Sequence, residues 1–585
     1  MFANRLRSVG LVGAVGLVAM LAAYLLWSAN SQAAKTKPDG GSNPAPADRI
    51  AEVQLLGVND FHGNLQSPRS LPKNGTPVPV GGAEYLDAYL DDYEAKNPDR
   101  TIRVHAGDMV GGTPLISSHF HDEPSVYAMN EMEFDIGTLG NHEFDEGGRE
   151  MLRMINGGQR DDGLQFKDGA DGQPVNTSDP GFPGAQFPYI AANTEYRDSG
   201  ENVLPPYKII RKDGIDVGFI GVTTEDTPNI VVPDAISPFR VTDISESVDR
   251  YVAQLKAKKV ETIVVLAHSG GFYDSARKAS GEVLSETAEM NDDVDVVVAG
   301  HSHSKLNDCV DDQTGQTRSA EPAGCAEDKL VIEAFSAGTA FDTVNMKVDR
   351  RTKDVISSTG SVVTTYQDGV APDARTAALV KDYKDRIAPV SNRVVGNAAS
   401  DISTTATAAG ESPMGDLIAD AQRKFAGADF AFMNPGGIRA PIAAGEVTYG
   451  ELFTVQPFDN QVVKMRLTGN QVYRVLEQQF GADGRTRILQ VSGLEFSYNS
   501  TNPAGQRITS VTLPDGTPVD RNATYTVAAN SFIATGGDGF TVFKEGQSPE
   551  TLGSDLDALE AHIDDLPSPF EAPDPNADPR ITKQG

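Results

Sequence analysis

The sequence predicts an α/β protein made of two successive layered units. From Val53 onwards, short apolar runs alternate with amphipathic stretches of helical periodicity, which is the pattern of buried strands joined by helices. A second pattern of this kind begins near Val394 and runs to about Leu566. Hydrophobic residues make up 39% and charged residues 23% of the 585 positions, a composition that supports packed cores.

Each apolar run of the first unit is expected to form one buried strand. These strands are predicted at residues 53–58, 102–105, 135–140, 217–222, 263–267 and 294–299. Residues 83–93 and 248–258 have the spacing of amphipathic helices, and residues 376–388 predict a helix that bridges the two units. The Gly-, Asp- and Pro-rich stretch 161–187 predicts a long surface loop.

The first 34 residues have the order of a targeting segment. Arg5 and Arg7 precede an apolar run at residues 9–27, and small residues follow at Ala33 and Ala34, as in a secretory signal peptide. Because the apolar run is long for a signal and near the lower limit for a membrane span, an uncleaved N-terminal anchor is the alternative. Either outcome predicts an exported protein that is secreted, periplasmic or held at the cell surface. Residues 35–50 are rich in Pro, Gly and Ser and predict a flexible tether.

The charge balance limits the partners of the chain. The formal net charge of −32 repels nucleic-acid polymers and anionic membranes, so contact with a membrane is expected only through an uncleaved anchor. A phosphate substrate would be repelled as well, unless metal ions or clustered arginines supply local positive charge. The two cysteines, Cys309 and Cys325, are too few for a structural zinc site and, in an exported chain, predict one disulfide.

Polar side chains follow the apolar strands at the points where five of them end. They are Asp60, His62, Asp108, Asn141, His268, His301 and His303. Because ligands bind outside the carboxyl ends of strands in α/β sheets, these side chains are expected to converge on one rim. Oxygen and imidazole donors without thiolates suit Zn, Mn, Fe, Co or Ni better than calcium. Seven donors exceed the needs of one tetrahedral ion and predict two divalent ions that share a bridging carboxylate.

These residues resemble the motifs of a known family. N-D-x-H-G, G-D, G-N-H-E-x-D, a lone histidine at a strand end and G-H-x-H are similar to the motifs of the calcineurin-like metallophosphoesterases. The forms D-F-H-G and G-N-H-E-F-D resemble the 5′-nucleotidase branch, which includes UDP-sugar hydrolases and 2′,3′-cyclic phosphodiesterases. The resemblance implies a four-layer αββα metallophosphoesterase domain followed by an α/β 5′-nucleotidase C-terminal domain.

The resemblance also implies a role for each motif residue. One metal ion would be held by Asp60, His62, Asp108 and His303, and the other by Asp108, Asn141, His268 and His301, with Asp108 as the bridge. His142 and Asp145 are similar to the catalytic dyad of the family. An imidazole polarised by a carboxylate is a good donor to the negative charge that develops in the transition state.

Motifs of the second half resemble the nucleotide-binding half of the same family. Asn434 and Arg439 lie in N-P-G-G-I-R, Phe458 and Asn460 in Q-P-F-D-N, and Phe532 and Asp538 in F-x-A-T-G-G-D-G. The resemblance implies that the two phenylalanines sandwich the base, that Asp538 contacts the sugar, and that Asn434 and Arg439 face the phosphate and ribose.

One segment departs from the family pattern. Many relatives carry phosphate-binding arginines upstream of the E-S-x-x-G-D-L-I-A-D-A stretch, and these positions fall on Thr404 and Ala408. Bidentate contacts from arginine to phosphate are strong and directional. Their loss weakens the expectation of tight monophosphate binding and affects a less charged cyclic diester less.

The predicted organisation and function follow from these motifs. We expect a signal or anchor at 1–34, a tether at 35–50, a metallophosphoesterase domain at 51–350, a linker with a helix at 351–392, a substrate-binding domain at 393–566 and a disordered tail at 567–585. The predicted reaction is hydrolysis of nucleoside 5′-monophosphates and related small-molecule nucleotides by attack of a metal-bound water. One alternative is a 2′,3′-cyclic nucleotide or nucleotide-sugar diesterase. The other is a surface nucleotide-binding protein with little catalysis.

Overall fold

Two β-sheets form the centre of the first half of the chain. The computed structural model describes residues 49–160, 166–167, 174–175, 177–274, 276–311, 313–326, 328–458, 460–481 and 485–584. The first sheet has the strand order β21 (Val355–Thr364), β20 (Ala340–Asp349), β1 (Ile50–Val58), β4 (Thr101–His105), β5 (Ile136–Thr138) and β8 (Tyr189–Ile190). The second has the order β10 (Tyr207–Lys212), β11 (Ile215–Thr223), β13 (Thr262–His268), β16 (Val296–Ala299), β19 (Lys329–Ala334), β17 (Lys305–Val310) and β18 (Thr317–Ser319).

The strands that precede the predicted metal ligands are parallel to their neighbours. In the first sheet, β1 pairs with β4 and β4 with β5 in parallel register. In the second sheet, β13 pairs with β16 in the same way. Parallel pairing brings the carboxyl ends of the strands to one edge of each sheet. The predicted ligands therefore come from two sheets and not from the single sheet edge that the sequence suggested.

Alternating side chains of β1 explain why the two sheets pack together. Val53 and Leu55 point into a buried cluster that also contains Leu266 of β13. Leu56 and Val58 point to the other face, into a cluster with helical residues. Successive side chains of a strand lie on opposite faces, so a strand that is apolar at nearly every position must be covered on both sides.

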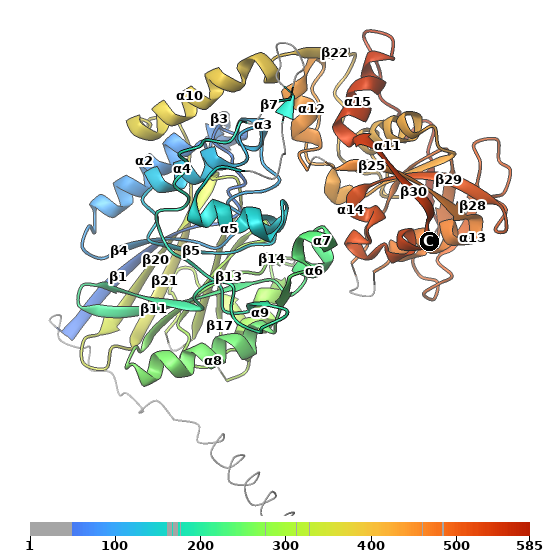
Figure 1. Ribbon diagram of the computed structural model, residues 1–585. Helices are drawn as coiled ribbons and strands as arrows, with labels where there is room; N and C mark the ends of the chain where they lie inside the picture. Colours follow the sequence, from blue (N-terminus) through green and yellow to red (C-terminus); the bar gives the residue numbers. More distant parts are fainter. Residues whose placement is uncertain are drawn as a thin grey trace, which may run out of the picture. The chain divides into compact units, whose positions relative to one another are not determined.

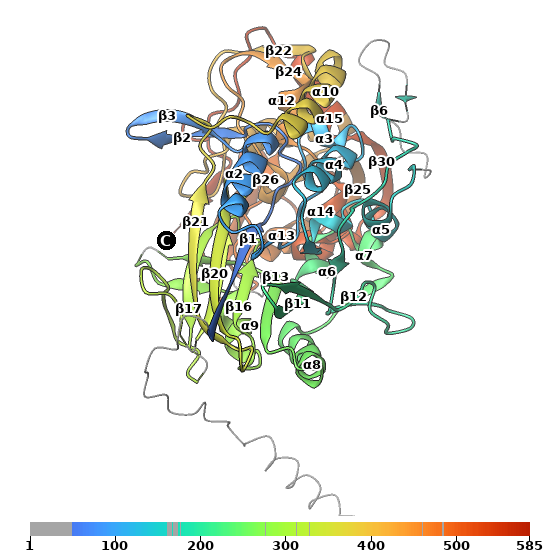
Figure 2. The ribbon, with the colours of Figure 1, turned by 90° about the vertical axis from the view of Figure 1, so that its left-hand side faces the viewer.

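Helices cover the outer faces of both sheets (Figures 1 and 2). On the first sheet lie α2 (Ala83–Ala95) and α4 (Glu123–Glu131), and α10 (Ala374–Ser391) packs against both. On the second sheet lie α8 (Ile244–Ala257) and α9 (Glu282–Glu289). The order helix, sheet, sheet, helix is the predicted αββα layering. Helix α8 begins where the Asp243 side chain accepts a hydrogen bond from the Glu246 backbone N–H (2.7 Å), which satisfies one of the unpaired donors of its first turn.

The second half of the chain contains a mixed five-stranded sheet. Its order is β26 (Gln490–Ser492), β23 (Phe430–Met433), β29 (Thr524–Asn530), β25 (Gln461–Thr468) and β30 (Gln547–Ser554). Helices α11 (Pro413–Ala426) and α15 (Asp555–Asp564) pack against each other beside it, and α13 (Gly469–Gln478) contacts β25. Capping boxes at Thr448 and Thr468 begin α12 (Tyr449–Val455) and α13, so local sequence signals set where these helices start.

Two predicted boundaries are wrong. The linker was expected to begin at residue 351, but β21 lies within 351–392 and pairs with β20 along its length. The tail 567–585 was expected to be disordered, but β31 (Ile581–Lys583) pairs with β27 (Glu495–Tyr498). The Arg580 guanidinium donates to both oxygens of Asp420 (2.9 and 2.8 Å). Both segments are polar, so only pairing with distant residues gives them order.

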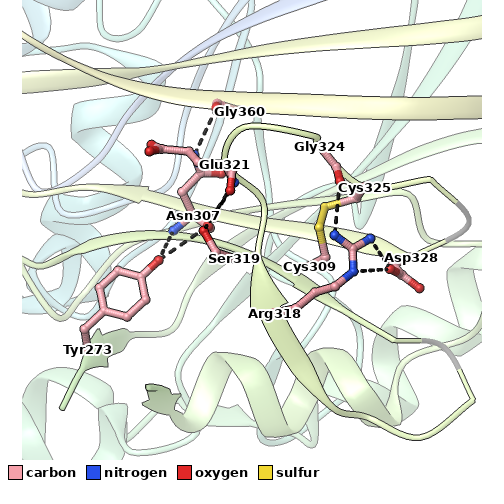
Figure 3. The surroundings of a disulfide bond; sticks show 10 residues. All are labelled: Tyr273, Asn307, Cys309, Arg318, Ser319, Glu321, Gly324, Cys325, Asp328 and Gly360. Carbon is pink, nitrogen blue, oxygen red and sulfur yellow. Dashed lines mark hydrogen bonds and ion pairs between the residues drawn. A yellow bond between two sulfur atoms is a disulfide. The ribbon is translucent and has the colours of Figure 1, made fainter. Parts of the chain in front are cut away.

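The cysteines Cys309 and Cys325 form a disulfide with their Cα atoms 5.6 Å apart. Arg318 lies beside it, donates to the Gly324 carbonyl (3.2 Å) and pairs with Asp328 (Figure 3). The bridge joins β17 to the segment before β19, so it fastens the edge of the second sheet.

The predicted targeting segment 1–34, the tether up to residue 48 and most of the predicted loop 161–187 lie outside the described residues. Within the part of the chain that the structure describes, no helix is long and apolar enough to cross a membrane.

Candidate active site

The predicted metal ligands stand directly after, or at the end of, their strands. Asp60 and His62 follow β1, Asp108 follows β4, and Asn141 follows β5. On the second sheet, His268 is the last residue of β13 and His301 and His303 follow β16. Five of the seven have a positive φ: Asp60 (50°), His62 (45°), Asp108 (51°), His301 (77°) and His303 (54°). Such strain in non-glycine residues gathers at functional sites and persists only where the surrounding structure enforces it.

The first donor cluster contains Asp60, His62 and His303, whose ligand atoms all lie within 4.8 Å of one another. The Nε2 atoms of His62 and His303 are 3.1 Å apart. The Nε2 atom of His303 is 3.4 Å from Oδ1 of Asp60. Three donors that face one point are an arrangement that can hold a divalent cation.

The second cluster contains Asp108, His268 and His301, again within 4.8 Å of one another. His268 Nε2 is 3.0 Å from Asp108 Oδ2 and 3.1 Å from the Asn141 side-chain oxygen. Asn141 therefore joins this cluster, as the family resemblance implies.

Asp108 lies between the two clusters. Its Oδ2 atom is 3.0 Å from His268 Nε2 in one cluster and 3.8 Å from His62 Nε2 in the other. This is the position expected of a bridging carboxylate, and the assignment of all seven residues as ligands stays a prediction.

The surroundings of Asp60 suit a residue that binds a cation. Its Oδ2 atom accepts hydrogen bonds from the Asn59 side chain (2.7 Å) and the His301 backbone N–H (2.8 Å). Its Oδ1 atom is buried and has no hydrogen-bond partner among the described residues. Burial acts to raise the pKa of Asp60, but the neighbouring His303 lowers it to about 2. A buried, ionised oxygen that faces two imidazoles fits a metal ligand.

Backbone carbonyls orient two of the imidazoles. His62 Nδ1 is 2.8 Å from the Gly111 carbonyl, and His268 Nδ1 is 2.8 Å from the Ala106 carbonyl. When Nδ1 donates its proton to a carbonyl, the lone pair of Nε2 faces the cluster. Burial lowers the pKa of His62 to about 3 and that of His301 to about 4, which keeps both imidazoles neutral, the form that binds metal.

Glu143 is a functional residue that the sequence did not assign. Its carboxylate accepts hydrogen bonds from the backbone N–H groups of Asp108 (3.0 Å), Met109 (2.9 Å) and Gly140. It thus ties the loop after β4 to the loop after β5. The only sequence signal was its place inside the motif G-N-H-E-x-D, because two of its three hydrogen-bond partners, Asp108 and Met109, lie in the loop after another strand.

His142 and Asp145 form a hydrogen-bonded pair. His142 Nδ1 is 2.7 Å from Asp145 Oδ2, and the His142 backbone N–H donates to Asp108 Oδ1 (2.8 Å). Burial acts to lower the pKa of His142, but Asp145 and Asp108 raise it to about 9. The imidazole is therefore held as a proton donor beside the two clusters.

A cavity of about 500 Å³ joins this site to the second half of the chain. Its volume is within the range of small-molecule sites. The predicted residues that line it are Asp108, Asn141, His142, Asp145, His301, His303, Asn434, Arg439, Phe458, Asn460, Phe532 and Asp538. Asp60, His62 and His268 are buried and do not line it. All six predicted substrate-binding residues thus share one cavity with the predicted dyad.

The polar residues contributed by the second half are held by side chains of that half. The Asn434 side chain donates to Asp538 Oδ2 (3.1 Å) and accepts from Asn530 (2.8 Å). Asn460 accepts from the Ser531 hydroxyl (3.0 Å). Burial lowers the pKa of Arg439, while Asp145, Asp108 and Asp60 act to raise it. This guanidinium therefore lies near the carboxylate partner of His142 and the two carboxylates of the metal-ligand clusters.

Two further arginines in the cavity were missed. Thr404 and Ala408 do not line it, but Arg485 and Arg487 do. Arg485 pairs with Asp226 (3.3 Å) and Glu282 (3.4 Å) of the first half. The loop that lacks arginine lies close by, because the Gln490 side chain donates to the Gly410 carbonyl (2.8 Å). The sequence signal was the pair of arginines just before β26, which no motif explained.

Comparison with known proteins places each half in a described family. Residues 53–305 match the family described as calcineurin-like phosphoesterase, and residues 393–545 match the family described as 5′-nucleotidase, C-terminal domain. Among solved structures, the chain is similar to a 5′-nucleotidase precursor from Thermus thermophilus, with a TM-score of 0.74 and 28% identity, covering 92% of this chain and 100% of that one.

Two curated relatives are each 33% identical to this chain. One is a cell wall protein of Listeria monocytogenes, matched over 91% of this chain and 69% of the relative. The other is an endonuclease of Bacillus subtilis, matched over 90% of this chain. The chain spans only 40% of the length of that endonuclease.

Proposed function

This chain belongs to the 5′-nucleotidase family of calcineurin-like phosphoesterases, and from that premise we propose that it hydrolyses nucleoside 5′-monophosphates and related nucleotides. The observation that carries the proposal is the shared cavity. It is lined by members of both clusters of metal-ligand type, by the hydrogen-bonded pair of His142 and Asp145, and by two phenylalanine rings.

The two clusters would hold a pair of divalent ions, with Asp108 between them. When bound, these ions would polarise the phosphoryl group and lower the pKa of water enough to supply a nucleophile near neutral pH. The chain's own contribution is to fix the donors, through the carbonyls of Gly111 and Ala106 and the backbone hydrogen bonds to Glu143.

His142 and Arg439 would act on the charge that develops during the reaction. His142 is held protonated by Asp145 and can donate its Nε2 proton to the leaving oxygen. Arg439 lines the same cavity and can stabilise the negative phosphoryl oxygens.

Phe458 and Phe532 would grip the base. Both line the cavity, and stacking of a base on an aromatic ring contributes roughly 1–3 kcal/mol without a hydrogen-bond code. Several bases should therefore be accepted. Asp538 lines the same cavity and would accept hydrogen bonds from the sugar.

Export is part of the proposal. It is supported by the basic start, the apolar run and the small residues of positions 1–34, and by the similarity to a cell wall protein. The protein would act on nucleotides outside the cytoplasm, in secreted, periplasmic or surface-bound form.

A substrate panel tests the proposed reaction. Purified protein, reconstituted with Mn²⁺, Zn²⁺ or Co²⁺, is given AMP, 2′,3′-cyclic AMP and UDP-glucose. The products are separated by chromatography and quantified: adenosine and phosphate from AMP, adenosine 2′- or 3′-monophosphate from the cyclic nucleotide, and UMP and glucose 1-phosphate from UDP-glucose. His142→Ala should lower kcat on AMP by about 100-fold or more and keep the metal content of the wild type. His562→Ala is the matched control, because His562 does not line the cavity.

The panel also decides between the alternatives. The absence of arginine at Thr404 and Ala408 favours a diesterase, which would hydrolyse the cyclic nucleotide or the nucleotide sugar faster than AMP. A chain that binds nucleotides but shows no metal-dependent turnover on any of the three would be a nucleotide-binding protein, and the proposal would fail.

A further inference from the structure

Arg487 and Asp538 form an ion pair inside the cavity. The Arg487 Nε atom is 3.5 Å from Asp538 Oδ1, and the two side chains are only 17% and 14% exposed. Both line the cavity. The Asn434 side chain donates to the other carboxylate oxygen, Oδ2 (3.1 Å). Asp538 is therefore held at both oxygens, by a neutral amide on one side and a guanidinium on the other.

The backbone of Asp538 is in an unusual conformation. Asp538 has φ 55° and ψ 16°, a left-handed conformation that costs an L-residue about 1–2 kcal/mol. It stands between Gly537 and Gly539, whose missing side chains give it no lateral packing. The direction of the carboxylate is thus set by its partners, Arg487 and Asn434, more than by its neighbours in the chain.

Arg487 also offsets negative charge in the cavity. The cavity already contains the carboxylates of Asp108 and Asp145, and the chain has a net charge of −32. A third carboxylate without a partner would repel a phosphorylated substrate. The adjacent guanidinium offsets that charge and leaves Asp538 able to accept hydrogen bonds.

Arg439 lines the same cavity as Arg487 but has different acidic neighbours. Arg439 is in the field of Asp145, Asp108 and Asp60, on the side of the metal-ligand clusters. Arg487 is paired with Asp538. The two guanidinium groups therefore face different carboxylates of the cavity.

We propose that Arg487 is a positioning residue for sugar recognition, which with Asn434 aims the Asp538 carboxylate at the vicinal hydroxyls of a ribose. A carboxylate offers about four acceptor positions, so hydroxyl donors can bind Asp538 alongside Asn434 and Arg487. The site then selects ribonucleotides over nucleotides without these hydroxyls. This inference rests on the proposed function, because it takes a nucleotide as the ligand.

A set of matched substrates isolates the contribution of the sugar hydroxyls to binding. AMP, 2′,3′-dideoxy-AMP and p-nitrophenyl phosphate share a phosphate monoester, but only AMP carries the vicinal hydroxyls. Wild type is expected to have a KM for AMP about tenfold below that for dideoxy-AMP, the effect of losing hydrogen bonds to a charged group. Arg487→Met should raise the KM for AMP about tenfold, change kcat less than threefold, and leave both other substrates within twofold.

Three further variants locate the effect. Arg487→Lys, which keeps the charge, should recover part of the AMP affinity. Asp538→Asn should lose the same discrimination, and the double variant Arg487→Met/Asp538→Asn should be no worse than Asp538→Asn alone, because the arginine acts through the aspartate. Arg474→Met is the control, since Arg474 pairs with Glu545 on the surface and should behave as wild type.

The outcomes separate the two proposals. An equal loss on AMP and dideoxy-AMP in Arg487→Met would overturn the positioning role, because the arginine would then act on the phosphate or on the fold. If the wild type hydrolyses none of the three esters, the proposed function fails, and calorimetric binding of AMP and dideoxy-AMP in EDTA still tests Arg487. Equal affinities of wild type for these two nucleotides would overturn the inference without any turnover.

Discussion

The imidazole of His142 and the ring of Phe458 stack against each other, with their centroids 5.8 Å apart and their planes 14° from parallel. His142 follows a strand of the first sheet and Phe458 belongs to the second half of the chain. The Arg439 guanidinium lies 5.6 Å from the same Phe458 ring. Phe458 is thus a common neighbour of the proposed proton donor and the proposed phosphate contact.

Phe458→Ala should weaken the binding of nucleotides more than it affects the hydrolysis of small phosphate esters. Loss of one stacking surface is expected to raise the KM for AMP about tenfold, whereas kcat/KM for p-nitrophenyl phosphate should change less than threefold, because Asp145 still holds His142. Steady-state kinetics on both substrates measure this. Phe425→Ala, an exposed phenylalanine on α11, is the control. Equal losses on both esters would mean that Phe458 serves the dyad and not the base.

Asp108→Asn should lower the metal content of the protein more than any other single substitution. Because Asp108 lies within 3.8 Å of a histidine from each cluster, its neutralisation is expected to lower the affinity for both ions, whereas Asp60→Asn should affect only the first. Elemental analysis after dialysis against a metal buffer is expected to give two ions per chain for the wild type and fewer than one for Asp108→Asn. Asp92→Asn on the surface of α2 is the control. Two retained ions in Asp108→Asn would contradict the bridging role.

Asp87 should make stability fall as the pH rises. Burial between α2 and α10 raises its pKa to about 7, although a hydrogen bond from Thr376 and the nearby Arg103 act to lower it. The folded state therefore binds a proton that the unfolded chain releases above pH 4, and the stabilisation present below pH 4 is lost progressively up to pH 7. Asp87→Asn should abolish this fall in stability between pH 4 and 7, because asparagine does not ionise.

Denaturant unfolding at pH 4, 5.5 and 8 measures the Asp87 effect. The stability of Asp87→Asn relative to wild type should increase between pH 4 and 8, on the order of 2 kcal/mol. The same exposed control, Asp92→Asn, should follow wild type at every pH. A difference between Asp87→Asn and wild type that is constant with pH would refute the assignment.

Removal of the disulfide should lower the stability of the fold without changing the activity of the site. Cys309 and Cys325 are separated by 16 positions, and closing a loop of that length stabilises a fold by about 3 kcal/mol in the loop-entropy account. The double variant Cys309→Ala/Cys325→Ala should unfold at lower denaturant but show wild-type kcat and KM on AMP at 25 °C. A reducing agent should reproduce the loss in wild type and have no effect on the variant. If the variant were as stable as the wild type, the disulfide would not stabilise the fold.

Local patterns in the sequence were enough to place the chemistry along the chain. A strand that is apolar at nearly every position has to be buried, so the residues that end it, such as Asp60 and His268, could be assigned to sheet edges. Side-chain caps such as Asp243 likewise act within one turn of a helix. Both signals depend on neighbours a few positions apart and need no knowledge of the fold.

What only the tertiary structure decided are the contacts between residues far apart in sequence. The division of the ligands between two sheets, the hydrogen bonds of Glu143 to the loop after β4, the ordering of Ile581–Lys583 on β27 and the pairing of Arg487 with Asp538 leave no periodic trace in the sequence. Hydrophobic periodicity records which face of an element is buried, but not which distant element covers it. A polar side chain gains its role from a partner that only the folded chain brings within reach.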